Sequence, residues 1–202
     1  MSLGKKAVFF IILILILDQT LKIWVKTHLV IGQEIHLLGK SGMLHFIENN
    51  GMAFGMEMGG RPGKLILSIF RIIAICGIGW YLSALVKKGA SLGLILAVSA
   101  IMAGAIGNII DSAFYGMIFS ESYTQPAILF PPGGGYSSFL HGRVVDMLYF
   151  PVVNTHWPNW SPVKPGESFI FFRPVFNLSD TSITCGVIAI LLFQKKMFKG
   201  FS

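Results

Sequence analysis

The stretch FNLSDTSITCGVIAILLF, residues 176–193, joins two polar side chains to an apolar run long enough to cross a membrane. A helix needs about 20 mainly apolar residues to span a hydrocarbon core of about 30 Å. Asn177 and Asp180 stand in the first turns of this run, where a buried carboxylate is energetically unfavourable. Because acids in such segments are rare and mark functional sites, the stretch predicts both a membrane helix and a candidate site.

Three further apolar stretches and the overall composition also indicate a membrane protein. Of the 202 residues, 53% are hydrophobic and 12% are charged, about half the charged fraction of a typical soluble domain. The sequence predicts transmembrane helices at about residues 7–25, 65–86, 92–110 and 175–193, with outer loops at about 27–63 and 112–174. We expect an all-α integral membrane protein, one domain over residues 1–202, with small extracytoplasmic β and loop elements.

Basic residues predict the orientation of these helices. The chain has 16 Lys and Arg against 9 Asp and Glu, a formal net charge of +7. The bases lie beside apolar segments, which indicates the positive-inside rule rather than nucleic-acid binding. Three clusters flank one side of the four-helix arrangement: Lys5 and Lys6; Lys87 and Lys88; and Lys195, Lys196 and Lys199. We therefore expect both termini to lie in the cytoplasm, and no nucleic-acid partner.

Two Asn/Asp pairs lie at matching depths near the outer surface of the predicted bundle. Asn108 and Asp111 end the third segment, and Asn177 and Asp180 open the fourth. The i, i+3 spacing within each pair places both side chains on one helix face. Interhelical hydrogen bonding or helix capping could explain either pair alone, but two matching pairs favour a shared site.

Two more acids and two arginines are candidates. Asp18 and Lys22 share a face of the first helix, and we favour an ion pair that orients this helix over a catalytic role. Asp146 lies in the apolar loop stretch GRVVDMLYF, which we expect to pack against the helix ends, with Arg143 offsetting its charge. Arg71, in the second segment, either extends toward the surface or pairs with one of the acids.

Several carboxylates at one membrane surface can hydrolyse a peptide bond. An ionised carboxylate takes a proton from water while a protonated neighbour donates a hydrogen bond to the scissile carbonyl. The residues alone do not select the pair from the four acids Asp18, Asp111, Asp146 and Asp180. The five histidines lie outside the apolar segments and form no H-E-x-x-H motif, so we expect no metal and no cofactor.

Two other classes of function stay open at this point. Intramembrane acids also form proton relays, as in a small channel or proton-coupled transporter. Against this, the acids gather at one surface and the second apolar segment carries none. A non-catalytic assembly or lipid-binding protein would explain the aromatic loops but not the paired Asn/Asp motifs.

Five short motifs, weak singly but specific in their order, resemble those of the lipoprotein signal peptidases, the type II signal peptidases of bacteria. They are DQTLK at 18–22, NNGMAFG at 49–55, GNIID at 107–111, VVDM at 144–147 and FNLSD at 176–180. The resemblance implies an aspartic peptidase of the inner membrane with Asp146 and Asp180 as the catalytic pair. It also implies supporting roles for Asp18, Lys22, Asn49, Gly51, Asn108, Asp111 and Asn177.

The resemblance further implies the substrate. It would be a prolipoprotein whose cysteine already carries diacylglycerol, cut on the amino side of that cysteine. Membrane lipids and globomycin-type inhibitors would be the other partners, and we expect a monomer. A site near the outer surface suits this substrate, because its lipid anchors the scissile bond there.

The chain departs from the family pattern in three ways. Ser112 stands where the family usually has Arg, and Arg143 or Arg71 would have to replace that side chain. Ser179 stands where Ala is frequent. The stretches before and after Asp146 are longer than in compact members, and these insertions would form either a lid or platform for substrate, or decoration.

Overall fold

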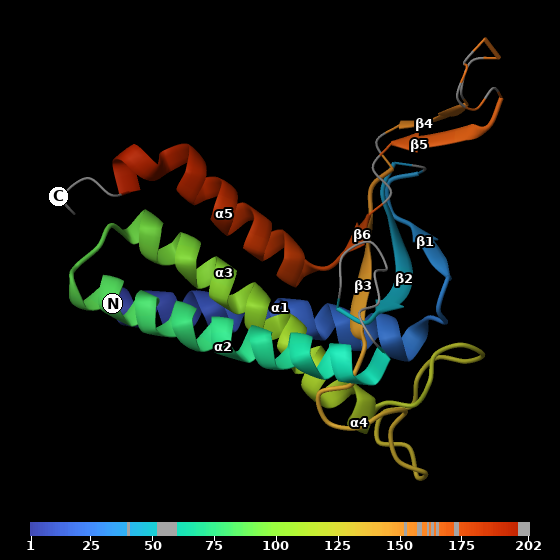
Figure 1. The fold of residues 1–202 in the computed structure, drawn as a ribbon, viewed down its shortest axis with the longest axis horizontal. Helices are drawn as coiled ribbons and strands as arrows, with labels where there is room; N and C mark the ends of the chain where they lie inside the picture. Colours follow the sequence, from blue (N-terminus) through green and yellow to red (C-terminus); the bar gives the residue numbers. More distant parts are fainter. Residues whose placement is uncertain are drawn as a thin grey trace.

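The structure, a computed structural model, describes residues 1–39, 41–51, 60–151, 153–156, 159–160, 162, 164, 166–171 and 174–197. It combines a bundle of long helices with a small sheet at one end of the bundle (Figure 1). The long helices are α1, Leu3–His28; α2, Gly60–Lys87; α3, Leu92–Ile110; and α5, Leu178–Met197. Helix α3 continues through a π-helical turn η2, Asp111–Tyr115, into the short α4, Gly116–Ile118.

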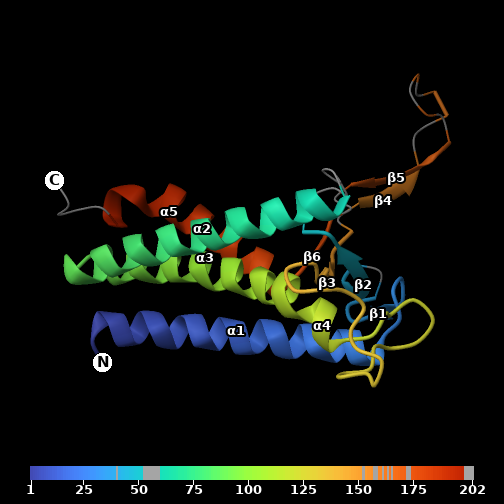
Figure 2. The ribbon, with the colours of Figure 1, turned by 60° about the horizontal axis from the view of Figure 1, so that its bottom comes forward.

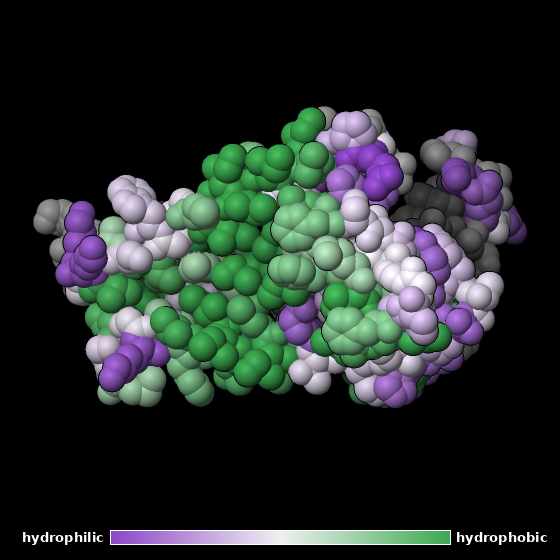
Figure 3. All heavy atoms as spheres, turned by 90° about the horizontal axis from the view of Figure 1, so that it is seen from below, coloured by the Kyte–Doolittle hydropathy of each residue, from purple (hydrophilic) through white to green (hydrophobic). Residues whose placement is uncertain are grey.

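The four long helices are long and apolar enough to cross a membrane, which makes the chain a multi-pass membrane protein. Apolar side chains cover the middle of the bundle, and hydrophilic ones gather at its two ends (Figure 3). Helix α3 packs against each of the other three (Figure 2). Accordingly, 56% of its most apolar window is buried, against 17%, 11% and 17% for α1, α2 and α5, which therefore face the lipid.

The long helices extend beyond the predicted segments at several ends, and two of the differences from the predicted boundaries lie beside the site. The third span reaches Ile118, so the second outer loop begins after this residue and not at 112. The helix continues past the last apolar run because its polar residues there, such as Ser112, find partners inside the protein. The fourth helix begins at Leu178 and not at 175, because Val175–Phe176 pairs as a strand and Asn177 caps the helix.

The sheet brings the two predicted loops together. Its strand order is β1-β2-β3-β6, all antiparallel, with β1 at Glu34–His36, β2 at Met43–Asn49, β3 at Val144–Tyr149 and β6 at Val175–Phe176. A second hairpin, β4 at Val153–His156 and β5 at Ser168–Phe171, projects beyond the sheet (Figure 1). Residues 52–55 of the NNGMAFG motif lie outside the described part of the chain.

The side chains of β2 and β3 alternate between the two faces of the sheet. Phe46, Val145 and Met147 are fully buried in a core that also contains Val25 of α1. Asp146 lies between two of these residues and therefore points to the opposite face, toward the ends of α3 and α5. The apolar stretch around Asp146 is thus a strand and not a loop, and it packs against the helix ends as expected.

The two ends of the bundle differ in character. The start of α1, the end of α5 and the turn between α2 and α3 lie together, far from the sheet (Figure 1). This end gathers the predicted lysine clusters Lys5, Lys6, Lys87, Lys88, Lys195 and Lys196. Lys199 lies outside the described residues.

Glycines allow α3 and α5 to approach closely. A Cβ added at Gly104 would lie 2.2 Å from the backbone oxygen of Ser179, and one at Gly186 would lie 2.6 Å from that of Ala97. Small residues at such crossings bring helix backbones together in membrane proteins, where dispersion contacts replace the hydrophobic effect.

Gly104→Ala should therefore lower the unfolding temperature of the purified protein in detergent, because the added methyl group would overlap the backbone of α5. Overpacking of this kind costs about 1–3 kcal/mol. Gly77→Ala in α2 is the matched control, because its Cβ would have nothing within 4 Å. Equal unfolding temperatures for the two variants would contradict the close packing of α3 and α5.

Candidate active site

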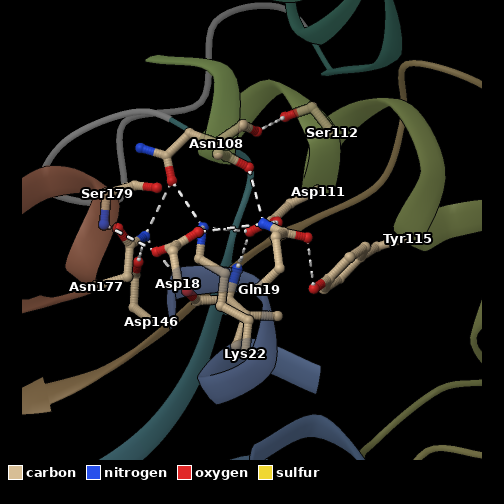
Figure 4. A network of polar contacts seen from close by, with 12 residues as sticks. Asp18, Gln19, Lys22, Asn108, Asp111, Ser112, Tyr115, Asp146, Asn177 and Ser179 are labelled. Carbon is tan, nitrogen blue, oxygen red and sulfur yellow. Dashed lines mark hydrogen bonds and ion pairs between the residues drawn. The ribbon is translucent and has the colours of Figure 1, made fainter. Parts of the chain in front are cut away.

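Polar side chains from α1, α3, the sheet and the start of α5 meet at the sheet end of the bundle (Figure 4). We call them the carboxylate cluster: Asp18, Gln19, Lys22, Asn49, Asn108, Asp111, Asp146, Asn177 and Asp180. The two Asn/Asp pairs of the sequence thus lie in one site, joined by the Asp18–Lys22 pair and by Asp146.

Lys22 is the cation at the centre of this cluster. Its ammonium is fully buried and lies 3.0 Å from a carboxylate oxygen of Asp18 and 2.9 Å from one of Asp111. A third hydrogen bond, of 3.0 Å, reaches the side-chain oxygen of Asn108, so all three donors of the ammonium have an acceptor. The ion pair expected within α1 is present, and it also ties α1 to α3.

Asp18 and Gln19 extend these contacts. Asp18 accepts the backbone N–H of Ser179 at 2.8 Å, which joins α1 to the start of α5. Gln19 donates to Asp18 and Asp111 at 3.1 and 3.0 Å and accepts the hydroxyl of Tyr115 at 3.1 Å. Gln19 was not among the residues predicted from the sequence, although an amide inside an apolar span is itself an unusual feature that could have marked it.

Asn177 caps α5 and also reaches across the site. Its side-chain oxygen accepts the backbone N–H of Asp180 at 2.8 Å, and Asp180 accepts the backbone N–H of Asn177 at 3.4 Å, as in a capping box. The Asn177 amide donates to Asp146 at 2.7 Å and to Asn108 at 3.1 Å. Asn108 donates to Asp180 at 2.8 Å, so two amide side chains bridge Asp146 and Asp180.

Strand pairing brings Asp146 into this position. Asp146 lies opposite Ile47, and Asn49, on the same face of β2, donates its amide to the Asp146 carboxylate. The Asn49 oxygen accepts the N–H of Gly51, whose φ of 88° lies in the left-handed region that favours glycine. A Cβ at Gly51 would also lie 2.6 Å from the guanidinium of Arg71.

Arg71 faces the site rather than the membrane surface. Its guanidinium donates to the carbonyl of Gly51 and interacts electrostatically with Asp180, Asp111 and Asp146. The guanidinium is thus directed toward the acids, but the ion pairs among the described residues include none between Arg71 and an acid, so the predicted pairing is not confirmed. Ser112, where the family usually has Arg, donates its hydroxyl to the backbone oxygen of Asn108 within the same helix.

Arg143 contacts other residues. Its guanidinium pairs with Glu48 at 3.0 Å and with Glu121, and it donates to the hydroxyl of Tyr123 at 2.7 Å. Arg143 precedes β3 on the face opposite to Asp146, because alternate residues of a strand share a face. The structure therefore does not place Arg143 in the carboxylate cluster, and the expected offset of the Asp146 charge is not found.

The pKa of Asp146 differs from that of an ordinary surface carboxyl. Burial raises the pKa of Asp146 to about 7, and the nearby charge of Asp180 adds to this rise. Hydrogen bonds from Asn177 and Asn49 and the charge of Lys22 act in the opposite direction. A carboxyl with a pKa near 7 beside a second carboxylate can donate or accept a proton at neutral pH.

This arrangement can activate a water molecule by general acid–base chemistry. Two bridged carboxylates can supply one acid and one base, and the surrounding amides hold their oxygens in place. Across the described part of the chain, His, Cys, Asp and Glu side chains form no group of three or more that could hold a metal ion.

Known proteins share this sequence and this fold. The family model described as signal peptidase (SPase) II matches residues 10–196. A lipoprotein signal peptidase of Porphyromonas gingivalis is 50% identical over 190 residues, which cover 94% of this chain and 82% of the relative. One of Amoebophilus asiaticus is 38% identical over 187 residues, covering 91% and 75%. A solved bacterial membrane enzyme has the same fold, with a TM-score of 0.60 at 23% identity over 95% of this chain and 88% of that one.

Lys22→Met should destabilise the protein, because Asp18 and Asp111 would stay buried without their shared counter-charge. Breaking a buried ion pair in this way costs about 3–5 kcal/mol, so we expect a lower unfolding temperature in detergent. Lys87→Met, at the exposed end of α2, is the matched control.

Adding Asp111→Asn to Lys22→Met should recover part of the lost stability, because one of the two unpaired charges is then removed. A double variant no more stable than Lys22→Met would show that the loss is not electrostatic.

Proposed function

We propose, from the premise that this chain belongs to the signal peptidase II family, that it cuts diacylglyceryl-modified prolipoproteins on the amino side of the lipidated cysteine. Membership of this peptidase family favours the enzyme over the transporter and assembly-protein hypotheses. The observation that supports the catalytic pair is the bridge from Asp146 through Asn177 and Asn108 to Asp180.

In the proposed mechanism the two carboxyls share one proton. The raised pKa of Asp146 assigns this proton to Asp146 in the resting enzyme, and Asp180 is the base. Asp180 takes a proton from water as the water oxygen attacks the scissile carbonyl, while Asp146 donates a hydrogen bond to the carbonyl oxygen. The intermediate then collapses as Asp180 passes the proton that it took from water to the amide nitrogen. The C–N bond breaks, which releases the signal peptide with a carboxyl end and the lipidated cysteine with a free amine.

The other members of the cluster hold this pair in place. Asn177 and Asn49 each bind one oxygen of Asp146, so the carboxyl cannot rotate freely. Asn108 orients Asp180 and is itself held by the ammonium of Lys22. These contacts support positioning roles for the residues of the family motifs.

The position of the site in the bundle supports a place at the outer face of the bacterial inner membrane. The site lies at the sheet end, and the lysine-rich end is opposite (Figure 1). The positive-inside rule places the lysine-rich end in the cytoplasm. Substrate acyl chains would then lie in the outer leaflet beside the bundle, and globomycin-type inhibitors would occupy the same site. We propose that residues 1–202 act as one membrane-embedded unit and as a monomer.

Asp146→Asn and Asp180→Asn should each lower kcat by about 10²–10⁴-fold, because an amide can neither accept nor donate the transferred proton. The assay is cleavage of a diacylglyceryl-modified precursor by purified protein, with unmodified precursor and globomycin as specificity controls. Glu167→Gln, at an exposed side chain, is the matched control and should keep full activity. Near-normal turnover by either aspartate variant would contradict the assignment of the pair.

The value of kcat/KM should fall about tenfold per pH unit above about pH 7, because Asp146 then loses the proton that it must donate. The sign follows from the raised pKa: the folded protein holds this proton up to about pH 7 and releases it as the pH rises further. Rates on the lipidated precursor, with the unfolding temperature measured at each pH, test this. A flat profile between about pH 6 and about pH 9 would contradict it.

A further inference from the structure

A second ionic cluster, centred on the buried side chains of Lys26 and Glu48, lies behind the sheet, on the face of β2 and β3 opposite to Asp146. We call it the back cluster: Lys26, Glu48, Glu121, Ser122, Tyr123, Tyr136 and Arg143. We propose that the back cluster holds β2 and β3 in the register that aligns Asn49 with Asp146, so that Lys26, Glu48 and Arg143 are positioning residues. This inference rests on the proposed function.

The ion pair of Lys26 and Glu48 is almost completely buried. The two side chains are 0% and 1% exposed. The Lys26 ammonium also donates to the hydroxyl of Ser122 at 2.9 Å and lies 4.9 Å from the ring centre of Tyr136. Desolvation offsets most of the attraction in such a pair, so it adds little stability, whereas it can select one arrangement of the segments that carry it.

One carboxylate in the back cluster joins three segments of the chain. Glu48 of β2 pairs with Lys26 of α1 and, through its second oxygen, with Arg143 at the start of β3, at 3.0 Å. Both oxygens of the carboxylate therefore have a cationic partner. A shift of β2 along β3 would separate these charges in a buried site, which is strongly unfavourable.

Asn49 and Asp146 lie on the opposite face of the sheet, next to the strand residues that the back cluster holds. Glu48 precedes Asn49, and neighbouring strand residues point to opposite sides. Glu48 is therefore held from behind while Asn49 donates to Asp146 in front. In the register of β2 and β3, Glu48 lies opposite Val145, the neighbour of Asp146.

Helix α1 carries both clusters. Asp18, Lys22 and Lys26 follow one another at intervals of four residues and so lie along one face of the helix. Lys22 binds the carboxylate cluster, and Lys26, one turn later, binds the back cluster. Because α1 is bound to both clusters, it fixes the position of β2 relative to α3, the helix that carries Asn108.

The predicted insertion before Asp146 supplies the remaining residues of the back cluster. The backbone N–H of Ala127 donates to the carbonyl of Lys26 at 2.9 Å, which ties residues 119–143 to α1. Tyr136 accepts the backbone N–H of Arg143 at 2.7 Å, and its ring centre lies 4.3 Å from the Arg143 guanidinium. The sequence analysis left two alternatives for this insertion, a substrate lid or decoration. Its contacts with Lys26 and Arg143 support a further role, behind the proposed catalytic strand, beside the alternatives of a substrate lid or platform and decoration.

Glu48→Gln tests the proposal, because it keeps the size of the side chain and removes the charge between Lys26 and Arg143. We expect kcat to fall about tenfold with KM changed less than about twofold, since catalytic groups must be held within about 0.5 Å. The alkaline limb of the pH profile should move to higher pH, because the Asn49 hydrogen bond that lowers the pKa of Asp146 is weakened. Asp180, Lys22 and Arg71, which also face Asp146, are unchanged in this variant.

Glu34→Gln is the matched control. It makes the same chemical change in β1 of the same sheet, where Glu34 pairs with His45 at 2.7 Å and its side chain is 40% exposed. We expect wild-type kcat and an unchanged pH profile. Arg143→Lys, which keeps the charge, should lose less kcat than Arg143→Met, and this pair decides the question if Glu48→Gln does not fold.

Hydrogen–deuterium exchange of the backbone amides of residues 43–49 and 144–149 measures how firmly β2 and β3 are paired, and it needs no substrate. Exchange should be faster in Glu48→Gln than in the wild type and in Glu34→Gln. A variant that unfolds at a lower temperature but keeps wild-type kcat, pH profile and exchange would overturn the proposal and leave a merely structural role. If the wild type does not cleave the lipidated precursor, the proposed function fails, and the exchange comparison still decides the positioning role.

Discussion

The buried ammonium of Lys22 is the interaction on which the rest of the structure depends. A lone charge among apolar helices is unfavourable, so acceptors from α1 and α3 must converge on it. Their convergence sets α1 against α3, and the bond from Ser179 to Asp18 adds the start of α5. The geometry of the proposed catalytic pair follows from the same contacts, because Asn108 binds both Lys22 and Asp180.

At the start of α5 the same two residues serve helix capping and the proposed catalysis. The first N–H groups of a helix have no partner within it, and Asn177 and Asp180 satisfy two of the backbone N–H groups there. Their remaining polar atoms are then free to face Asp146 and Asn108. The capping interpretation of this pair is therefore confirmed, and it is compatible with the proposed catalytic role, because each uses different atoms of the two side chains.

Asp146 and Arg143 show where sequence reasoning stops. Asp146 meets Asn49 across 97 residues of chain, and hydropathy or helical spacing describes only one segment at a time. Arg143 is three residues from Asp146 in sequence, yet the alternation of β3 turns the two side chains to opposite faces. The Arg71 guanidinium lies beside the site because it donates to the carbonyl of Gly51, 20 residues away along the chain.

The sequence by itself determined the four apolar spans, the lysine-rich end, the matching Asn/Asp pairs and the family motifs. These depend on local properties, namely hydropathy and the spacing of residues along one helix. Only the tertiary structure decided which polar groups share a site and which stand behind it. That decision depends on the antiparallel pairing of β2 with β3 and on the close approach of α3 and α5. Both are contacts between distant segments, which no local pattern encodes.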